Sequence, residues 1–326
     1  MARTVRAGVI GVGSMGRNHA RVLRELPDVN LVGIVDVDPS LKAVADEFGV
    51  PFFSDVKRFL DDASPECVIV AVPSIHHRDV ALTVLEQGIA CLVEKPLALS
   101  VVEGKDIITA ATTSGAALMV GHIERFNPVV AALRIYKDQG LLGDIVDIET
   151  VRISPHPSRD NDMDVVTDMA IHDIDIMFYL LETDVEDVQC ISSRKRAHAR
   201  ILLSFDSGVV GQCAVSWMSP KKIRCLRVFG TEALAELDYI TQELTIFKRG
   251  SFLKNLDFTQ LVLNPMDGEV LRPAVRKQEP LYRELEHFTS CVRDGTEPSP
   301  GGEEGLRALE VVERVRSRLS WSAEHA

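Results

Sequence analysis

The feature that most constrains this chain is a glycine-rich turn between an apolar run and a helix-forming segment. Residues 5–10 are apolar and β-type, and Gly11-x-Gly13-x-x-Gly16 follows at once. Gly11 permits a tight turn, Gly13 lets the backbone approach a pyrophosphate, and Gly16 lets the next helix pack close to the strand. The free N–H groups at the start of that helix would face the pyrophosphate. The pattern predicts a dinucleotide-binding turn.

A carboxylate at the end of the second apolar run bears on the choice of dinucleotide. Residues 30–35 form this run and Asp36 ends it, about 20 residues past the last glycine, where a carboxylate accepts hydrogen bonds from an adenosine ribose. A carboxylate repels a 2′-phosphate, and Val37 and Asp38 supply no cation for one. We therefore expect NAD rather than NADP.

Composition limits the class of protein. The 326 residues are 46% hydrophobic, enough for two domains with their own cores. A net charge of −12 argues against nucleic-acid binding. No apolar run reaches the length of about 18 residues that a membrane helix needs, and we expect no signal peptide and no membrane contact. The six cysteines show no CxxC and no clustering with histidine, so we expect no metal site, no structural disulfide and a reduced, cytoplasmic setting.

Strands and helices alternate over residues 1–121, which predicts an α/β Rossmann domain with a doubly wound parallel sheet. The expected strands are 5–10, 30–35, 50–53, 66–72, 89–93 and 117–120. From Pro128 onward the order changes to a helix, an alternating strand at 145–153, a helix at 166–181 and then a series of strands. We expect an α+β second domain over residues 122–326, with a mostly antiparallel open sheet, for substrate binding and oligomerisation. The last helix of the chain could pack back on the first domain.

Polar stretches follow three of the predicted parallel strands, at the edge where doubly wound sheets bind ligands. They are residues 72–77, 94–96 and 122–128. Lys95 stands between an acid and a proline directly after an apolar strand. It is either a solvated strand end or a cation aimed at the reacting oxygen of a substrate that lies over the nicotinamide.

Two residues of the second domain form a candidate proton-handling pair. Asp168 and His172 are four apart on a predicted helix and therefore share one face. Neutral histidine is the usual base near pH 7. The alternative is an ordinary surface acid beside one satisfied histidine.

These residues together carry a family resemblance. The combination of Gly11-x-Gly13-x-x-Gly16, Glu94-Lys95-Pro96, Arg125-Phe-Asn-Pro128 and Asp168-x-x-x-His172 resembles the glucose–fructose oxidoreductase/inositol dehydrogenase (Gfo/Idh/MocA) family over nearly the whole chain. The resemblance implies an NAD(P)-dependent oxidoreductase of a sugar or cyclitol carbinol that forms a dimer or tetramer through the open sheet. It implies that Lys95, Asp168 and His172 are catalytic and that Pro73 and His77 line the cofactor, with His76 an extra histidine. The expected cofactor-binding residues are Gly11, Gly13, Ser14, Met15, Gly16, Asp36, Val72, Pro73, His77, Glu94 and Lys95.

Residues 120–128, 168–177 and 217–224 are most similar to the subgroup that oxidises UDP-N-acetylglucosamine at C3. In that subgroup the 3-keto product passes to a pyridoxal-phosphate aminotransferase that makes the 3-amino sugar. Cations in the second domain of an acidic protein would suit the diphosphate of a nucleotide sugar, although each could be part of a solvated edge. These cations are Arg152, Arg159, Lys221, Lys222 and Arg224. The expected substrate-binding residues are Lys95, Arg125, Asn127, Arg159, Asp168, His172, Lys222 and Arg224.

The resulting hypothesis is the oxidation of a secondary alcohol on a nucleotide sugar. His172 takes the hydroxyl proton, Lys95 stabilises the developing alkoxide, and Asp168 orients the imidazole. Arg125 and Asn127 would shape the mouth of the pocket. One alternative keeps the enzyme class with another carbinol, such as inositol, a free sugar or a UDP-aminosugar uronate. The other is a catalytically silent binding protein for NAD or a nucleotide sugar, which would need neither Lys95 nor His172.

Overall fold

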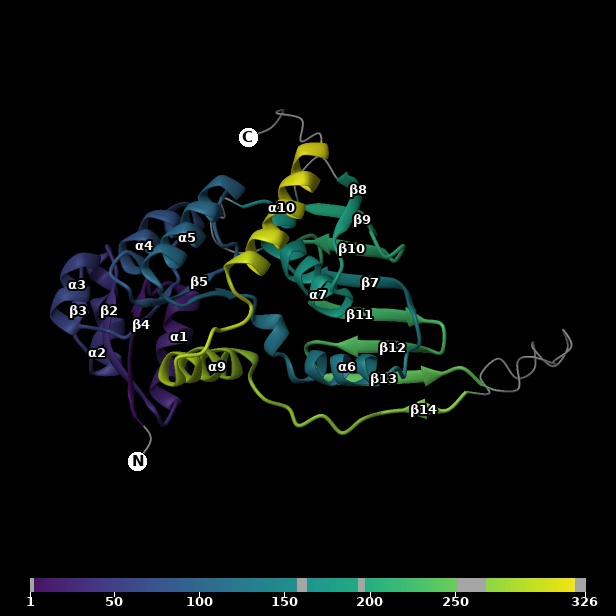
Figure 1. Ribbon diagram of the computed structural model, residues 1–326, viewed down its shortest axis with the longest axis horizontal. Helices are drawn as coiled ribbons and strands as arrows, with labels where there is room; N and C mark the ends of the chain where they lie inside the picture. Colours follow the sequence, from purple (N-terminus) through teal and green to yellow (C-terminus); the bar gives the residue numbers. More distant parts are fainter. Residues whose placement is uncertain (1–2, 157–162, 193–196, 251–267, 320–326) are drawn as a thin grey trace, which may run out of the picture. The chain divides into compact units, whose positions relative to one another are not determined.

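The computed structural model describes residues 3–156, 163–192, 197–250 and 268–319. The chain divides into two compact units, one of residues 1–126 and 279–313 and the other of residues 127–278 and 314–326. Each unit is built on one sheet (Figure 1).

The first unit holds a six-stranded, all-parallel sheet in the order β3-β2-β1-β4-β5-β6. Its strands are β1 (Val5–Ile10), β2 (Val29–Val35), β3 (Phe52–Phe53), β4 (Cys67–Val70), β5 (Ala90–Glu94) and β6 (Leu118–Gly121). The order reverses between β1 and β4, and the glycine turn follows β1 at this switch point, where doubly wound sheets bind nucleotides. The predicted Rossmann fold is confirmed.

Helices cover both faces of this sheet. They are α1 (Ser14–Glu25), α2 (Lys42–Phe48), α3 (Val56–Ala63), α4 (His77–Leu85), α5 (Val101–Ser114), α9 (Pro280–Asp294) and α10 (Gly302–Arg318). Local signals fix several helix starts. The Ser100 hydroxyl accepts a hydrogen bond from the Glu103 N–H at the start of α5, as an N-cap residue does.

The two C-terminal helices change the domain division expected from the sequence. Leu285 and Phe288 of α9 are fully buried and belong to the same apolar core as Val9 of β1. Leu306 and Leu309 of α10 belong to the core on the opposite face of the sheet. The first unit therefore extends to residue 126 and takes in residues 279–313, in place of the expected boundary at 121, because apolar residues far along the chain complete its two cores.

The second unit holds an eight-stranded sheet in the order β14-β13-β12-β11-β7-β10-β9-β8. Its strands are β7 (Ile145–Ile153), β8 (Val185–Ser192), β9 (His198–Phe205), β10 (Val210–Ser216), β11 (Ile223–Gly230), β12 (Ala233–Asp238), β13 (Glu243–Lys248) and β14 (Val270–Leu271). Only the β7–β10 pair is parallel among the described strands of this sheet. The predicted, mostly antiparallel sheet is confirmed.

Helices α6 (Pro128–Asp138) and α7 (Ile171–Leu181) pack on one face of this sheet. The burial of β9 alternates along the strand: Ile201 and Leu203 are buried, whereas Leu202 between them is exposed. One face of the sheet thus carries the core, and the other is open as far as the described residues show.

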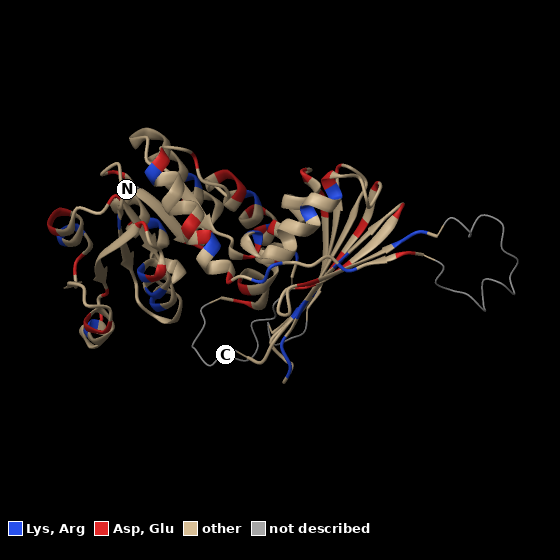
Figure 2. Ribbon diagram, turned by 90° about the horizontal axis from the view of Figure 1, so that it is seen from below, with Lys and Arg blue, Asp and Glu red and all other residues tan. Residues whose placement is uncertain are grey.

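Acidic and basic residues are interspersed along the helices rather than segregated by sign (Figure 2). Among the described helices, we find none that combines the length and apolar character required to traverse a lipid bilayer.

Candidate active site

The glycine turn of the first unit is shaped to admit a ligand at one of its three glycines. Gly11 has a φ of +84°, and a Cβ there would lie 2.7 Å from the Val72 backbone nitrogen. A Cβ on Gly16 would strike the Gly11 carbonyl oxygen. A Cβ on Gly13, in contrast, would have no described atom within 4 Å. The turn is therefore packed tightly behind and open at Gly13, as close approach of a pyrophosphate requires.

The start of α1 and the end of β2 complete this cradle. Gly13 is the N-cap of α1 and has no side chain to satisfy the first N–H groups, which leaves them for an anion. Gly13 and Ser14 are exposed and Met15 is half-buried. Asp36 accepts hydrogen bonds from the N–H groups of Val12, at 2.8 Å, and Asp38, at 3.0 Å. These bonds hold its carboxylate beside the turn, so the residues present fit NAD.

Lys95 occupies a turn that buried residues fix on both sides. It is half-buried, whereas Glu94 and Pro96 are buried, and the Lys95–Pro96 peptide is cis. Lys95 has a partner of its own in the fold.

His77 connects the polar stretch at residues 72–77 with this turn. It is 1% exposed, its Nδ1 lies 2.8 Å from the Pro96 carbonyl oxygen, and its Nε2 lies 3.0 Å from the Val72 carbonyl oxygen. Burial lowers the pKa of His77, against the opposing effect of these hydrogen bonds. His77 thus contacts backbone atoms of both segments. Of the other residues in the stretch, Val72 is half-buried, and Pro73 and His76 are exposed. Direct contact of these residues with the cofactor stays a prediction.

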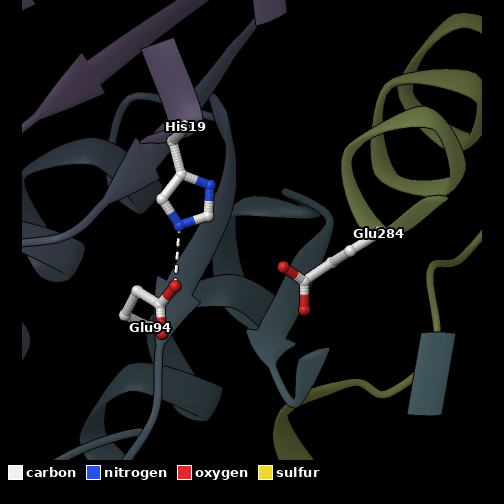
Figure 3. Close-up of side chains that lie close together, drawn as sticks. All are labelled: His19, Glu94 and Glu284. Atoms are coloured by element: carbon white, nitrogen blue, oxygen red, sulfur yellow. Dashed lines mark hydrogen bonds and ion pairs between the residues drawn. The ribbon is translucent and has the colours of Figure 1, made fainter. Parts of the chain in front are cut away.

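A buried cluster under Lys95 escaped the sequence analysis. His19 of α1, Glu94 at the end of β5 and Glu284 of α9 converge from three elements (Figure 3). The His19 Nε2 lies 2.7 Å from Glu94 Oε1, and the Lys95 N–H donates to Glu94 Oε2 at 3.2 Å. His19 follows the glycine turn on α1, but no local signal in the sequence connects it with Glu284, 265 positions later.

Hydrogen bonding and neighbouring charges give the two buried carboxyl groups of this cluster opposite pKa shifts. Burial raises the pKa of Glu94, but the hydrogen bond from His19 and the charges of His19, Lys95 and His77 outweigh it, and the pKa is lowered overall. Burial and the neighbouring charge of Glu94 raise the pKa of Glu284 well above its ordinary value.

Asp168 and His172 stand out in the second unit by their exposure. Along residues 164–178 every residue is buried except these two, which are half-buried. The sequence predicts one regular helix over residues 166–181. The structure differs, because Val166–Ala170 forms a π-helical turn before α7. Such turns are frequent at functional sites. Both side chains have interactions within the fold, and their catalytic roles stay predictions.

The candidate phosphate-binding cations divide into buried and accessible ones. Arg152 is 1% exposed, donates from Nη2 to Asp173 at 2.9 Å and lies over the Tyr239 ring. The prediction for Arg152 is therefore wrong, because its charge is used in a buried ion pair. Lys221 and Lys222 are exposed and Arg224 is half-buried. Arg159 lies outside the described residues.

Arg125 and Asn127 have contacts within their own units. The Arg125 side chain is 8% exposed and its Nη1 lies 3.8 Å from Glu304. The Asn127 side chain accepts a hydrogen bond from the Val129 N–H at the start of α6 and donates to the Tyr239 carbonyl oxygen at 3.1 Å. These contacts give Asn127 a structural role, and its contact with substrate stays a prediction.

A cavity of about 520 Å³ lies elsewhere in the first unit. Residues 26–29, which lead into β2, line it together with Phe126 and residues of α9. It adjoins the amino end of β2, whereas the glycine turn follows the carboxyl end of β1. The cavity is therefore separate from the cofactor cradle.

Comparisons with known proteins agree with this geometry. Residues 5–122 match the "Oxidoreductase family, NAD-binding Rossmann fold" and residues 130–236 match the "GFO/IDH/MocA C-terminal domain". The chain is 31% identical to UDP-N-acetylglucosamine 3-dehydrogenase of Acidithiobacillus ferrooxidans over 96% of both chains. It is 29% identical to scyllo-inositol 2-dehydrogenase (NAD(+)) of Bacillus subtilis over 91% of this chain and 89% of that one.

Solved structures show the same fold. A crystal form of the A. ferrooxidans UDP-N-acetylglucosamine 3-dehydrogenase has a TM-score of 0.86 at 26% identity, covering 97% of this chain and 98% of that one. Levoglucosan dehydrogenase in complex with NADH and levoglucosan has a TM-score of 0.85 at 19% identity, with 97% of each chain covered. The first unit is an NAD-binding domain, and the chain belongs to the Gfo/Idh/MocA family of oxidoreductases, as a dehydrogenase that acts on hydroxyl groups.

Proposed function

We propose that this dehydrogenase oxidises the C3 hydroxyl of UDP-N-acetylglucosamine to the 3-keto sugar, with NAD as the hydride acceptor. The observation that carries the proposal is the 31% identity to a UDP-N-acetylglucosamine 3-dehydrogenase over 96% of both chains. Inositol is the second candidate, because the 29% identical relative from B. subtilis is a scyllo-inositol dehydrogenase.

Three side chains divide the work of the reaction. His172 takes the proton of the substrate hydroxyl, and Asp168 orients its imidazole ring. Lys95 donates a hydrogen bond to the same oxygen and stabilises the negative charge that develops on it as the hydroxyl proton leaves. NAD, when bound, supplies the hydride acceptor. The accessible positions of Asp168 and His172 on an otherwise buried segment support their part in this scheme.

The cations near the start of β11 fit a diphosphate better than a neutral polyol. Lys222 is exposed and Arg224 is half-buried, and a diphosphate gains charge-assisted hydrogen bonds from such groups. Inositol carries no charge and would gain little from them. Arg159 belongs to the same proposed set.

The deciding experiment follows NADH formation with UDP-N-acetylglucosamine, its uronate, a free sugar and inositol in parallel. We expect kcat/KM for UDP-N-acetylglucosamine to exceed the others by at least about tenfold, which is ~1.4 kcal/mol. A preference for inositol would contradict the proposal. NAD binding without reduction in the presence of any of these alcohols would instead favour a silent binding protein.

Variants of the cations sharpen this test. Lys222→Ala and Arg224→Ala should raise KM for the UDP-sugar and leave any residual turnover of inositol unchanged. Arg227 is the matched control, because it lies on the same strand and is paired with Glu236 at 3.0 Å. Arg227→Ala should leave both substrates unaffected.

The open face of the second unit's sheet suits a second copy of the chain. Ile191 is 76% exposed and Leu202 is 45% exposed, and both lie on the face opposite α7. We infer that a homodimer or homotetramer covers this face. Light scattering should give a mass of two or four chains, and Ile191→Glu with Leu202→Glu should lower it. A wild-type mass of one chain would contradict the inference.

The ketone product points to a partner enzyme. A 3-keto sugar is a substrate for transamination, and we propose that a pyridoxal-phosphate aminotransferase consumes it, with the amino group supplied by an amino donor that becomes a keto acid. Addition of such an enzyme with an amino donor should increase the amount of NADH formed at equilibrium, since removal of the ketone draws the oxidation forward. An unchanged yield would count against this link.

A further inference from the structure

Three ionisable side chains meet in the interior of the first unit, close behind Lys95. His19, Glu94 and Glu284 are 0%, 8% and 0% exposed. One nitrogen or oxygen atom from each lies within 4.8 Å of those of the other two (Figure 3). Two carboxyl groups and one imidazole thus share a small, buried space.

The hydrogen bonds in this space are unequally divided. Both oxygens of Glu94 accept a hydrogen bond, one from His19 and one from the Lys95 N–H. Neither oxygen of Glu284 has a hydrogen-bond partner among the described residues, and the same holds for His19 Nδ1. A buried carboxylate without any donor is costly, whereas a neutral carboxyl group is tolerated much better.

Charge balance leads to the same assignment. If both carboxyl groups were ionised, two negative charges would lie close together in a low-dielectric interior. One proton on a carboxyl group removes their repulsion. Among the described residues, Glu94 has two donors that favour its ionised form and Glu284 has none, so the proton belongs on Glu284.

We propose that Glu284 holds a proton at neutral pH and is a positioning residue for Lys95. Because Glu284 is neutral, Glu94 is the only carboxylate in the cluster and keeps His19 and the Lys95 N–H as its two donors. Glu94 then fixes the turn from which the Lys95 side chain extends. The consequence for catalysis rests on the proposed function of Lys95, but the proton on Glu284 does not.

Other ionisable groups lie on the elements that carry this cluster or pack against it. Lys95 and His77 act on Glu94 from the turn and from α4. The 3-10 turn Ile123–Phe126, which packs against α9, carries Glu124 and Arg125, and Arg125 lies near Glu304. The pKa of Glu284 is raised by burial and by Glu94, in agreement with the proton placed on it.

A divalent cation is the competing occupant of this space. One imidazole and two carboxylates are a ligand set that several divalent metals accept. A cation would have to replace the His19–Glu94 hydrogen bond, and it would need Glu284 to be ionised. The two occupants therefore predict opposite protonation states for Glu284.

Infrared spectroscopy of the full-length protein without substrate separates these states. A protonated carboxyl group has a carbonyl stretch that is distinct from those of carboxylates and amides. We expect this band at neutral pH in the wild-type protein and its loss in Glu284→Gln. Glu286→Gln, an exposed site on the same helix, is the matched control and should keep the band. If Glu284→Gln does not fold, loss of the band on raising the pH of the wild-type protein replaces the comparison.

Two results would overturn the assignment. One is the absence of a protonated carboxyl band that depends on Glu284. The other is stoichiometric binding of Zn²⁺ or Mn²⁺ to the wild-type protein that Glu284→Gln abolishes.

Turnover then tests the positioning role, with the best substrate of the screen. Glu284→Gln keeps a neutral group of the same shape, so kcat at neutral pH should stay within about twofold, whereas Glu94→Gln should lower it by about tenfold or more. Wild-type kcat should fall at alkaline pH as Glu284 ionises, and Glu284→Gln should remove that fall. Equal losses in both variants at neutral pH would refute the role of a neutral Glu284. Because the infrared result needs no substrate, failure of the proposed function leaves it intact.

Discussion

The His77 imidazole and the Pro96 carbonyl oxygen, 2.8 Å apart, connect the start of α4 with the turn that carries Lys95. A second carbonyl, that of Val72, lies 3.0 Å from the other ring nitrogen. One buried ring thus lies between two of the backbone segments at the carboxyl edge of the parallel sheet, and in its neutral form it donates to one of the two carbonyls.

Replacement of His77 should destabilise the first unit. A neutral His77 ring donates to one of the Pro96 and Val72 carbonyls, so His77→Leu removes one hydrogen bond, and an unsatisfied buried group costs roughly 1–3 kcal/mol. Denaturant unfolding should give a lower free energy of unfolding for the variant. An unchanged value would mean that the two contacts contribute nothing to stability.

The same residue should make stability depend on pH. Burial lowers the pKa of folded His77, so the unfolded chain binds a proton first as the pH falls below about 6.5. The contribution of His77 to stability is therefore present above that pH and is lost on acidification. The difference between wild type and His77→Leu should shrink from about pH 7.5 to pH 5.5, as followed by unfolding at each pH. A constant difference would contradict this assignment.

Two glycine substitutions should separate folding from cofactor binding. Gly16→Ala places a Cβ against the Gly11 carbonyl oxygen and should lower the melting temperature strongly. Gly13→Ala meets open space and should melt like the wild type, but with NAD affinity reduced by about tenfold, because the methyl group occupies the path of the pyrophosphate. Calorimetry and NAD titration measure the two effects. Normal NAD binding by Gly13→Ala would remove the turn from the cofactor site.

The proposed catalytic residues should be separable from cofactor binding. His172→Asn should lower turnover by on the order of 10²–10⁴-fold. Lys95→Met should lower turnover by on the order of 10²–10³-fold, because it removes a group that stabilises the transition state. His172→Asn should bind NAD with nearly unchanged affinity, and Lys95→Met should lose far more turnover than NAD affinity. Lys105→Met, an exposed lysine of α5, is the control for charge removal. Wild-type turnover in either variant would remove its assigned role.

Glu284 should reduce stability as the pH rises. The unfolded chain releases this proton near the ordinary value of 4.5, whereas the folded protein holds it to a higher pH. Between these values the folded state binds more protons, so stability falls with rising pH. The melting temperature of Glu284→Gln, relative to that of the wild type, should therefore increase as the pH is raised from about 5 to 8. Parallel curves would contradict a raised pKa.

Local patterns in the sequence were sufficient to predict most of the fold. The glycine turn and the apolar runs of β1 and β4 each involve neighbours within a few residues, and a local sequence pattern reports such features directly. Strand β7 begins and ends at the residues predicted, Ile145 and Ile153.

Features made by distant residues were not predictable in this way. Arg152 looks like a surface cation in the sequence, and only its pairing with Asp173 shows it to be buried. The cluster of His19 with Glu94 and Glu284 needs three elements to be folded together. The π-helical turn at Val166–Ala170 has no composition that distinguishes it from α-helix. In each case tertiary packing decides the outcome, and a local pattern does not record it.

The dependence of the first unit on α9 has a consequence for biosynthesis. Leu285 and Phe288 fill the same core as strand β1, so the nascent amino-terminal half emerges from the ribosome with an unfilled apolar gap. That gap closes only after the intervening polypeptide has been translated. Premature termination before α9 should thus yield an aggregation-prone product rather than a free-standing nucleotide-binding fragment.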